Sequence, residues 1–265
     1  MLATRALTRV ARAHQLVKRS LARTPPAPPQ AFVPGVGAAR QPAPGQAARP
    51  YTDAMERERE LKFSLLDPPP DDALLVDAFR GSGFALEPRG TRRQRDEYLD
   101  TPDGALRAAG VALRRREVDG VRLATLKTLG RVSGPYHERD ELELPLPADG
   151  GWPATLLARA AQFAPFDPAA LTPQVLLHTA RRVFAVRDQG APVAELCFDD
   201  VSARAPGEAR EALFLEAELE AAPGVPQAQL EAIVARLERV VALTPSGVTK
   251  LQRAEALLAL GALLE

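Results

Sequence analysis

The sequence contains very little cysteine and histidine: one cysteine and three histidines in 265 residues. A single cysteine excludes an intrachain disulfide framework and a cysteine-rich metal cluster. The histidines, His14, His137 and His178, lie far apart in the chain, so they leave little for a histidine-rich zinc site. Long apolar runs are missing as well, because no stretch approaches the roughly 18 residues that a membrane-spanning helix needs.

Two kinds of catalytic signature are also absent. The chain has no glycine-rich phosphate loop of the Walker or Rossmann type, and it shows no constellation of residues around a serine or cysteine nucleophile. It does have 46% hydrophobic and 26% charged residues, a composition typical of a soluble globular protein with ample material for a core. The length predicts one domain with an appendage.

The net charge of zero is the sum of a basic N-terminal part and an acidic remainder. Residues 1–54 hold eight Lys or Arg and one acidic residue, which leaves 26 basic and 33 acidic residues for 55–265. Residues 24–50 are crowded with Pro, Ala and Gly and show no period, so we expect a disordered segment. Residues 2–21 predict a basic amphipathic helix that resembles a mitochondrial transit peptide. The alternative is an inert tail from an over-extended start, since Met55 stands directly before the first patterned strand.

From Met55 onward the pattern mostly has a period of two, which is typical of β-strands. Eight strands are expected, over residues 56–63, 93–99, 111–117, 121–128, 137–146, 178–188, 193–201 and 212–221. Asp119-Gly120 and Asp188-Gln-Gly190 have the chemistry of tight turns between strands. Helices are expected after Asp71 or Asp72, over 226–243 and over about 249–264.

The alternation along these strands is unusual because one face carries formal charge. Glu58, Glu60 and Lys62 share a face of the first strand, and Arg114 and Arg116 share a face of the third. Further rows are His137, Arg139, Glu141 and Glu143, then Glu195 and Asp199, and then Glu216, Glu218 and Glu220.

Two arrangements satisfy this pattern of charge. In the first, an open sheet leaves the charges in water, where each ion pair contributes only about 0–1 kcal/mol. In the second, the sheet closes with its charges inward, and an eight-stranded barrel is just wide enough for side chains or one small ligand. Uncompensated buried charges are costly, so such an interior requires water, cations and a polyanion. The pattern alone does not decide between the two.

A family resemblance favours the closed arrangement. Glu58-Arg-Glu-Leu-Lys62 fits E-x-E-x-K, the signature of the CYTH superfamily, also called the triphosphate tunnel metalloenzymes. Further segments resemble that family in order along the chain: Tyr98-Leu-Asp-Thr-Pro-Asp103, Ala112-Leu-Arg114-Arg-Arg116, Leu126-Lys127, Arg181-Arg-Val-Phe184, Phe198-Asp199, Leu215-Glu-Ala-Glu-Leu-Glu220 and Ser246-Gly-Val-Thr-Lys250. Segments 98–104 and 130–141 look most like the bacterial inorganic triphosphatase branch.

The resemblance implies an α+β fold for residues 55–265. The expected architecture is a closed eight-stranded antiparallel β-barrel, a tunnel with a charged interior and helices packed outside. No CHAD domain, the C-terminal helical domain of several members of that branch, is expected. The implied activity is divalent-metal-dependent hydrolysis of inorganic triphosphate to pyrophosphate and phosphate. Thiamine triphosphatase activity, class IV adenylate cyclase activity and a non-catalytic polyphosphate-binding module are the alternatives.

The resemblance also implies roles for residues of this sequence. Arginine forks match phosphate oxygens well, and the implied substrate-binding residues are Lys62, Arg114, Arg116, Lys127, Arg139, Arg181 and Lys250. A one-residue shift of register would exchange Arg181 with Arg182. The implied catalytic residues are Glu58, Glu60, Lys62, Glu218 and Glu220, and the identity of a general base stays open. Mg²⁺ or Mn²⁺ favours oxygen ligands, and the implied metal ligands are Glu58, Glu60, Asp199, Glu216, Glu218 and Glu220.

The expected partner is a small polyanion, triphosphate, with no nucleic acid and no membrane. The folded part is acidic, and its basic residues are not interleaved with aromatic ones, which argues against nucleic-acid binding. We expect a monomer or a weak homodimer. The expected location is the cytoplasm, or an organelle if residues 1–54 are a genuine transit peptide.

Overall fold

The structure is a computed structural model, and it describes residues 54–263. The eight long strands are β1 (Glu56–Leu65), β2 (Phe84–Asp100), β3 (Val111–Val118), β4 (Val121–Thr128), β6 (Tyr136–Pro145), β7 (Thr172–Asp188), β8 (Ala191–Arg204) and β9 (Ala212–Ala221). The short strands are β5 (Arg131–Ser133) and β10 (Thr244–Pro245), and the helices are α2 (Asp72–Ala78), α3 (Ala105–Ala108), α4 (Ala154–Ala160), α5 (Gln227–Leu237) and α6 (Lys250–Leu263). The disordered extension and basic helix expected before residue 54 lie outside the described residues.

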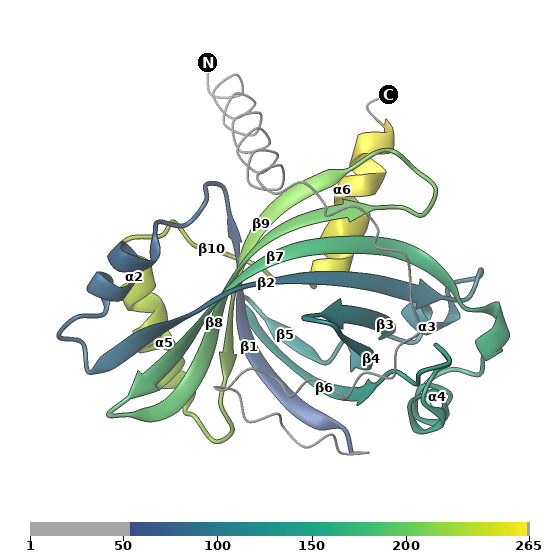
Figure 1. Cartoon of the computed structure of the whole chain (residues 1–265), viewed down its shortest axis with the longest axis horizontal. Helices are drawn as coiled ribbons and strands as arrows, with labels where there is room; N and C mark the ends of the chain where they lie inside the picture. The colour runs from purple at the N-terminus through teal and green to yellow at the C-terminus, as the bar shows by residue number, and fades with distance from the viewer. Residues whose placement is uncertain (1–53, 264–265) are drawn as a thin grey trace, which may run out of the picture. The chain divides into compact units, whose positions relative to one another are not determined.

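The eight long strands close into an antiparallel barrel. Their order is β1-β9-β8-β7-β2-β3-β4-β6, and β6 pairs back onto β1 from Glu56↔Glu141 to Leu61↔Tyr136. This last pairing excludes the open sheet, because the first and last strands of the order share hydrogen bonds. Figure 1 shows the strands wrapping around the right-hand part of the molecule, with β2 and β7 as long neighbours across it.

Each of the eight expected strands is present, and the largest difference in length concerns β2. We expected residues 93–99, whereas β2 starts at Phe84 and ends at Asp100. Pro88 and Gly90 have the composition of a loop, but a β-bulge between them lets the strand continue beside β7. β2 and β7 are therefore 17 residues long, whereas β3 and β4 have 8 residues each.

The two predicted tight turns have the backbone that such turns require. Asp119 and Gly120 between β3 and β4 have φ angles of 51° and 79°, and Gln189 and Gly190 between β7 and β8 have 47° and 86°. Positive φ at both central residues matches the right-handed twist of the flanking strands. These turns fix the register of both hairpins, and with it the face to which each charged residue points.

The helices cover apolar surface of the barrel. Leu106 of α3 and Leu156 of α4 pack with Leu113, Leu126 and Leu142. These strand residues alternate with the charged rows, so they lie on the outer face of β3, β4 and β6. α2 begins after Asp71, whose side chain accepts a hydrogen bond from the Leu74 amide at 2.9 Å. α2 and α5 lie together beside the other end of the long strands (Figure 1).

The sequence predicted the bounds of α6 more accurately than those of α5. α5 ends at Leu237 rather than at the expected residue 243, because the chain must leave the helix to pair β10 with Phe63 and Ser64 of β1. α6 agrees with the expected range. Its Ala254 and Leu258 pack with strand residues that share the inner face of the sheet, namely Tyr98, Val175, Leu177, Val201, Ala203 and Phe214. α6 therefore covers the inner face at one end of the barrel.

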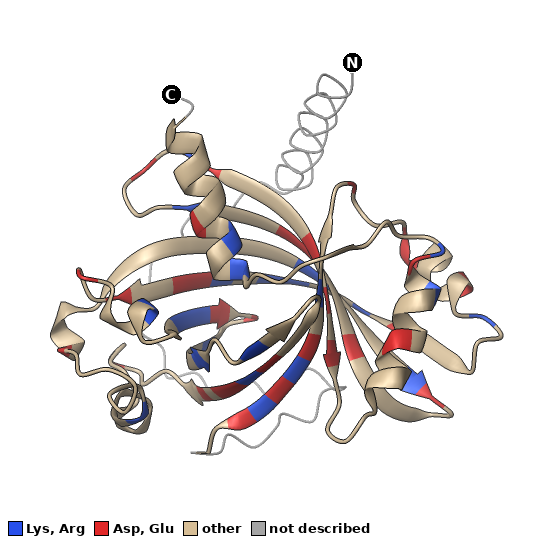
Figure 2. Ribbon diagram, turned by 180° about the vertical axis from the view of Figure 1, so that it is seen from behind, with Lys and Arg blue, Asp and Glu red and all other residues tan. Residues whose placement is uncertain are grey.

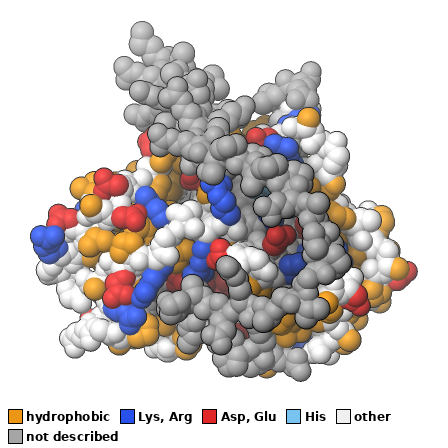
Figure 3. All heavy atoms as spheres, in the orientation of Figure 1, with side chains coloured by type: hydrophobic (Ala, Val, Ile, Leu, Met, Phe, Trp, Pro, Cys, Tyr) orange, Lys and Arg blue, Asp and Glu red, His pale blue; other side chains and the backbone are white. Residues whose placement is uncertain are grey.

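Two further observations concern the outside of the molecule. None of the helices among residues 54–263 has the length and apolar character to cross a membrane. On the face shown in Figure 3, the visible side chains of Lys and Arg are mixed with those of Asp and Glu rather than gathered by sign.

Candidate functional site

The charged rows of the sequence meet inside the barrel. On β1, Glu58, Glu60 and Lys62 alternate with outward residues, and Glu60 and Lys62 are only 3% and 2% exposed. Figure 2 shows the alternation of acidic and basic residues along this strand. The buried charged residues that join this cluster from other strands and from α6 are Asp96, Arg114, Arg139, Asp199, Glu216, Glu218 and Lys250. The closed sheet thus encloses a cluster of formal charges of both signs.

Glu58 lies between two cations of the lumen. Arg139 Nε is 2.7 Å from Glu58 Oε2, and Arg139 also binds Glu60. Lys127 Nζ lies 3.2 Å from Glu58 and 2.8 Å from Glu141. Burial by itself raises the pKa of Glu58, but Lys127 and Arg139 outweigh burial and lower that pKa well below its usual range. Glu58 is therefore ionised, and it holds two cations on the inner wall.

A second group joins β2, β3 and β4. Asp96 accepts hydrogen bonds from Arg116 Nε at 2.7 Å and Arg116 Nη2 at 2.8 Å. Arg114 Nη2 donates to Thr125 Oγ1 at 3.1 Å and to Glu143 Oε2 at 3.4 Å. Asp96 is 1% exposed and was not among the site residues expected from the sequence. The alternation of Gln94, Asp96 and Tyr98 within the expected strand 93–99 is the signal that could have placed Asp96 on the inner face.

The third group is a triad of acidic residues on β8 and β9. Asp199, Glu216 and Glu218 are buried, and one carboxylate oxygen from each lies within 4.8 Å of the others. The ammonium group of Lys250, at the start of α6, lies 2.5 Å, 3.1 Å and 3.5 Å from these three carboxylates in turn. Lys62 binds Glu218. Carboxylates from two neighbouring strands are thus gathered around one lysine that is distant in the sequence.

Arg181 completes the contacts of the triad. It forms a two-pronged contact with Asp199, at 2.9 Å from Nε and 2.6 Å from Nη2, and it also binds Glu218. Burial by itself raises the pKa values of Asp199 and Glu218, but Arg181 and Lys250 lower both below the usual range. Both carboxylates are therefore ionised in the folded protein.

The donor set of the triad fits a hard divalent cation. Carboxylate oxygens are the ligands that Mg²⁺ and Mn²⁺ prefer. Glu216 Oε1 is buried and accepts no hydrogen bond of good geometry, although it forms the ion pair with Lys250. Burial raises the pKa of Glu216. A bound cation would satisfy this oxygen, and it would compete with Lys250 for the same carboxylates.

Glu220 differs from the other acidic residues of the lumen. It lies opposite Glu60 on β1 and opposite Glu195 on β8, so acidic side chains flank it on both sides. Burial, together with repulsion from Glu58 and Glu60, raises the pKa of Glu220 to about 8. Burial and the surrounding negative charges therefore make Glu220 harder to ionise than an exposed glutamate.

The structure resolves the ambiguous register at Arg181 and Arg182. Arg181 points to the lumen, whereas Arg182 lies on the outer face, 5.5 Å from the ring centre of Phe184 and 5.4 Å from that of Phe198. Arg182 also donates to the carbonyl oxygen of Pro70 at 2.6 Å, which ties the start of α2 to the barrel. Arg182 thus has structural contacts on the outer face of the barrel.

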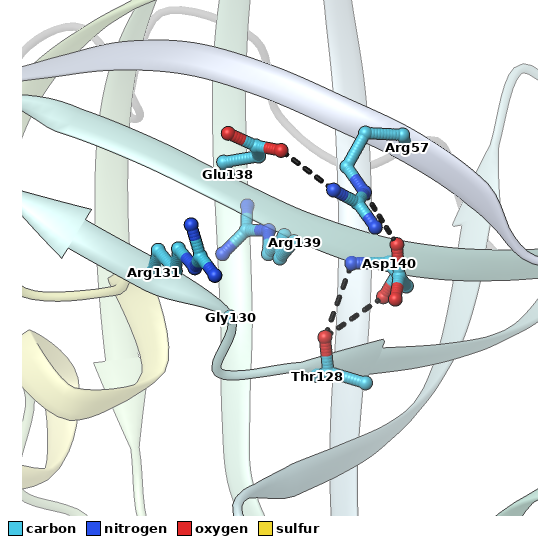
Figure 4. Close-up of a pocket in the computed structure, with 7 residues that line it drawn as sticks. All are labelled: Arg57, Thr128, Gly130, Arg131, Glu138, Arg139 and Asp140. Carbon is cyan, nitrogen blue, oxygen red and sulfur yellow. Dashed lines mark hydrogen bonds and ion pairs between the residues drawn. The ribbon is translucent and has the colours of Figure 1, made fainter.

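A pocket on the barrel wall lies beside the lumen cluster. Arg57, Thr128, Gly130, Arg131, Glu138, Arg139 and Asp140 line this cavity of about 270 Å³ (Figure 4). Arg57 is bound to Glu138 at 2.6 Å and to Asp140 at 2.7 Å, so its charge is already balanced. Gly130 packs against the backbone of Arg139, which connects this wall to the residues around Glu58.

Comparisons with known proteins agree with this architecture. The family model of the CYTH domain matches residues 56–254. HpAC1 of Hippeastrum, described as a candidate adenylyl cyclase with a dominant triphosphatase activity, is 20% identical with a TM-score of 0.54, over 75% of this chain and 95% of that chain. A candidate adenylate cyclase of Bacillus halodurans is 18% identical with a TM-score of 0.49, over 74% and 97% of the two chains. None of the curated proteins compared with the chain matches it.

Proposed function

The chain belongs to the CYTH domain family, and we propose that it hydrolyses inorganic triphosphate to pyrophosphate and phosphate with the help of a divalent metal ion. The observation that carries this proposal is the convergence of seven cations and a triad of acidic residues inside one closed barrel. A linear triphosphate offers many negatively charged oxygens within a short length. Such an anion would displace carboxylates from the cations, and a divalent metal ion would then compensate the carboxylates that lose their partner.

Substrate binding is assigned to the cations that the lumen carboxylates hold in place. These residues are Lys62, Arg114, Arg116, Lys127, Arg139, Arg181 and Lys250. Arg116 and Arg181 each lie in a two-pronged contact with a buried aspartate, so their planar groups have fixed orientations before the substrate binds. Fixed cations around the phosphoryl groups stabilise the charge that develops during phosphoryl transfer.

Metal binding is assigned to Asp199, Glu216 and Glu218, with Glu58, Glu60 and Glu220 as further acidic ligands. A bound Mg²⁺ or Mn²⁺ supplies Lewis acidity toward phosphoryl oxygens. Lys62 binds Glu218 and therefore orients one carboxylate of the triad.

The test is a substrate panel with the full chain. Tripolyphosphate, thiamine triphosphate, ATP and GTP are each assayed with Mg²⁺, with Mn²⁺ and with a chelator, and the phosphate released is measured. We expect the highest kcat/KM for tripolyphosphate and loss of turnover with the chelator. A preference for thiamine triphosphate or ATP would instead favour a thiamine triphosphatase or an adenylate cyclase. Tight binding of tripolyphosphate by calorimetry without turnover would favour a non-catalytic polyphosphate-binding module.

A further inference from the structure

Arg92 of β2 lies on the inner face of the barrel, and none of the sequence motifs includes it. It pairs directly with Arg181 of β7, and opposite residues of an antiparallel pair project from the same face of the sheet. Arg181 binds Asp199 and Glu218, so that face is the lumen. Gln94 pairs with Val118, the last residue of β3. Arg92 therefore lies one inward position beyond the end of β3, at the rim of the closed part of the barrel.

The charge environment of Arg92 is unlike that of the other lumen cations. Each of the seven proposed substrate-binding residues forms an ion pair with a lumen carboxylate. The side chain of Arg92 forms no hydrogen bond or ion pair with any residue in 54–263, and it is partly exposed. It also stands opposite a second arginine, and like charges in directly opposite positions destabilise a sheet.

Two arginines in directly opposite positions are expected at a site where a negatively charged ligand binds between them and offsets their repulsion. We propose that Arg92 binds a phosphoryl group of the substrate at the rim of the tunnel and so extends the site to linear polyphosphates longer than triphosphate. This inference rests on the proposed function, because it assumes that a polyphosphate binds the seven cations inside. Arg92 then lies beside Arg181 at the same level of the wall, where β3 has already ended.

The length of β2 supports a longer anion. Asp96, which holds Arg116, and Arg92 are four residues apart on one strand, a separation of about 13 Å at 3.3 Å per residue. An anion that reaches both Arg116 and Arg92 must extend along this part of the wall. The extra contact is a charge-assisted hydrogen bond, which is among the stronger polar contacts of a binding site.

The same strand offers a matched control. Arg93 and Arg95 carry the same charge as Arg92 and lie within three residues of it, and both are exposed. Arg93 pairs with Ala180 and points to the opposite face of the sheet. Arg92→Gln and Arg93→Gln change the net charge equally and alter adjacent positions of one strand. A difference in polyphosphate binding between the two variants is therefore caused by the face of the sheet on which the arginine lies, and not by the total charge of the protein.

The experiment compares the full wild-type chain, Arg92→Gln and Arg93→Gln with tripolyphosphate and tetrapolyphosphate. We expect Arg92→Gln to raise KM for tetrapolyphosphate about tenfold or more, and KM for tripolyphosphate less than about threefold. Arg93→Gln is expected to leave both constants near their wild-type values. Calorimetric titration with each polyphosphate in the presence of a chelator measures the same selectivity without turnover, and thermal unfolding checks that both variants fold.

The outcomes separate this inference from the proposed function. If the wild-type chain binds and hydrolyses tripolyphosphate, but Arg92→Gln and Arg93→Gln behave alike, the role of Arg92 is refuted and the proposed function stands. An equal rise of KM for both polyphosphates in Arg92→Gln would also refute the extension to longer chains. If the wild-type chain neither binds nor hydrolyses either polyphosphate, the proposed function fails, and the inference fails with it.

Discussion

Asp96 and Arg116 face each other across β2 and β3, and two parallel hydrogen bonds of 2.7 Å and 2.8 Å join them. Arg114 Nε lies 4.0 Å from the same carboxylate. The side chain of Asp96 has no exposed surface, so this pair of charges is shielded from water. Asp96 thus compensates the arginines that we propose as substrate ligands on β3.

Replacing Asp96 with Asn should destabilise the folded protein. The change removes the charge but nearly preserves the shape, and it leaves Arg116 and Arg114 with less compensation in a buried position. Breaking one side of a buried ion pair costs about 3–5 kcal/mol. Denaturant unfolding at pH 7 measures this loss. Glu97→Gln, at the neighbouring position on the other face of β2, is the control and should change the free energy of unfolding by less than about 1 kcal/mol.

The effect of Asp96→Asn should depend on pH in a defined direction. Burial raises the pKa of Asp96, but Arg116 and Arg114 together lower it below the usual range in the folded state. A group with a depressed folded pKa contributes its stability above its unfolded pKa, about 3.9 for Asp, and loses it as the pH falls through the folded pKa. The difference between wild type and variant should therefore be constant from pH 7 to about 5 and shrink below about 4. A difference that grows in acid would contradict this assignment.

Arg114→Ala should weaken substrate affinity more than it slows the chemical step. Arg114 is buried on the inner face beside Thr125, and we propose that it binds phosphoryl oxygens. Loss of hydrogen bonds to a charged group predicts a rise of KM for tripolyphosphate by about tenfold or more. The matched control is Arg115→Ala, because Arg115 points outward and stacks on Trp152 at 4.7 Å from the ring centre. That variant should lose about 0.5–1 kcal/mol of stability and keep its KM.

Gly130→Ala should disturb the lumen through the backbone of β6. A methyl group at Gly130 would lie 2.0 Å from the carbonyl oxygen of Glu138 and 2.7 Å from Cα of Arg139. Since Arg139 holds Glu58 and Glu60, the clash should lower both the melting temperature and kcat/KM. Gly134→Ala is the control: it has a similar positive φ of 58° but no atom within 4 Å of the added carbon. Gly134→Ala should lose only the stability that a non-glycine residue costs in the left-handed region, about 1–2 kcal/mol. Equal losses of stability and of kcat/KM in the two variants would contradict the prediction.

Lys250→Met should make the stability of the protein more dependent on a divalent cation. The ammonium of Lys250 contacts Asp199, Glu216 and Glu218, so its removal leaves buried negative charge without that compensation. We expect a loss of about 3–5 kcal/mol in chelator and a larger rise of melting temperature with Mg²⁺ than in the wild type. Potassium chloride at the same ionic strength is the control for screening. An identical response of both proteins to Mg²⁺ would argue against a cation site at this triad.

Much of the barrel could be predicted because strand alternation is a local property of the backbone. Successive side chains point to opposite faces, so the spacing of Glu58, Glu60 and Lys62 is enough to place them on one side. The same reasoning missed Asp96, although its strand was expected, because its row of Gln94 and Tyr98 carries no other charge. It also missed Arg92, since the bulge between Pro88 and Gly90 concealed the first half of β2.

The sequence by itself determined which residues form strands and which charged residues share a face, since both depend on neighbours two positions away. Only the tertiary structure decided that the sheet closes, because the pairing of Glu58 with Arg139 joins strands about 80 residues apart. It also decided which carboxylate meets which cation. Lys250 reaches Asp199 and Glu216 from the start of a helix, and no local period predicts where that helix packs.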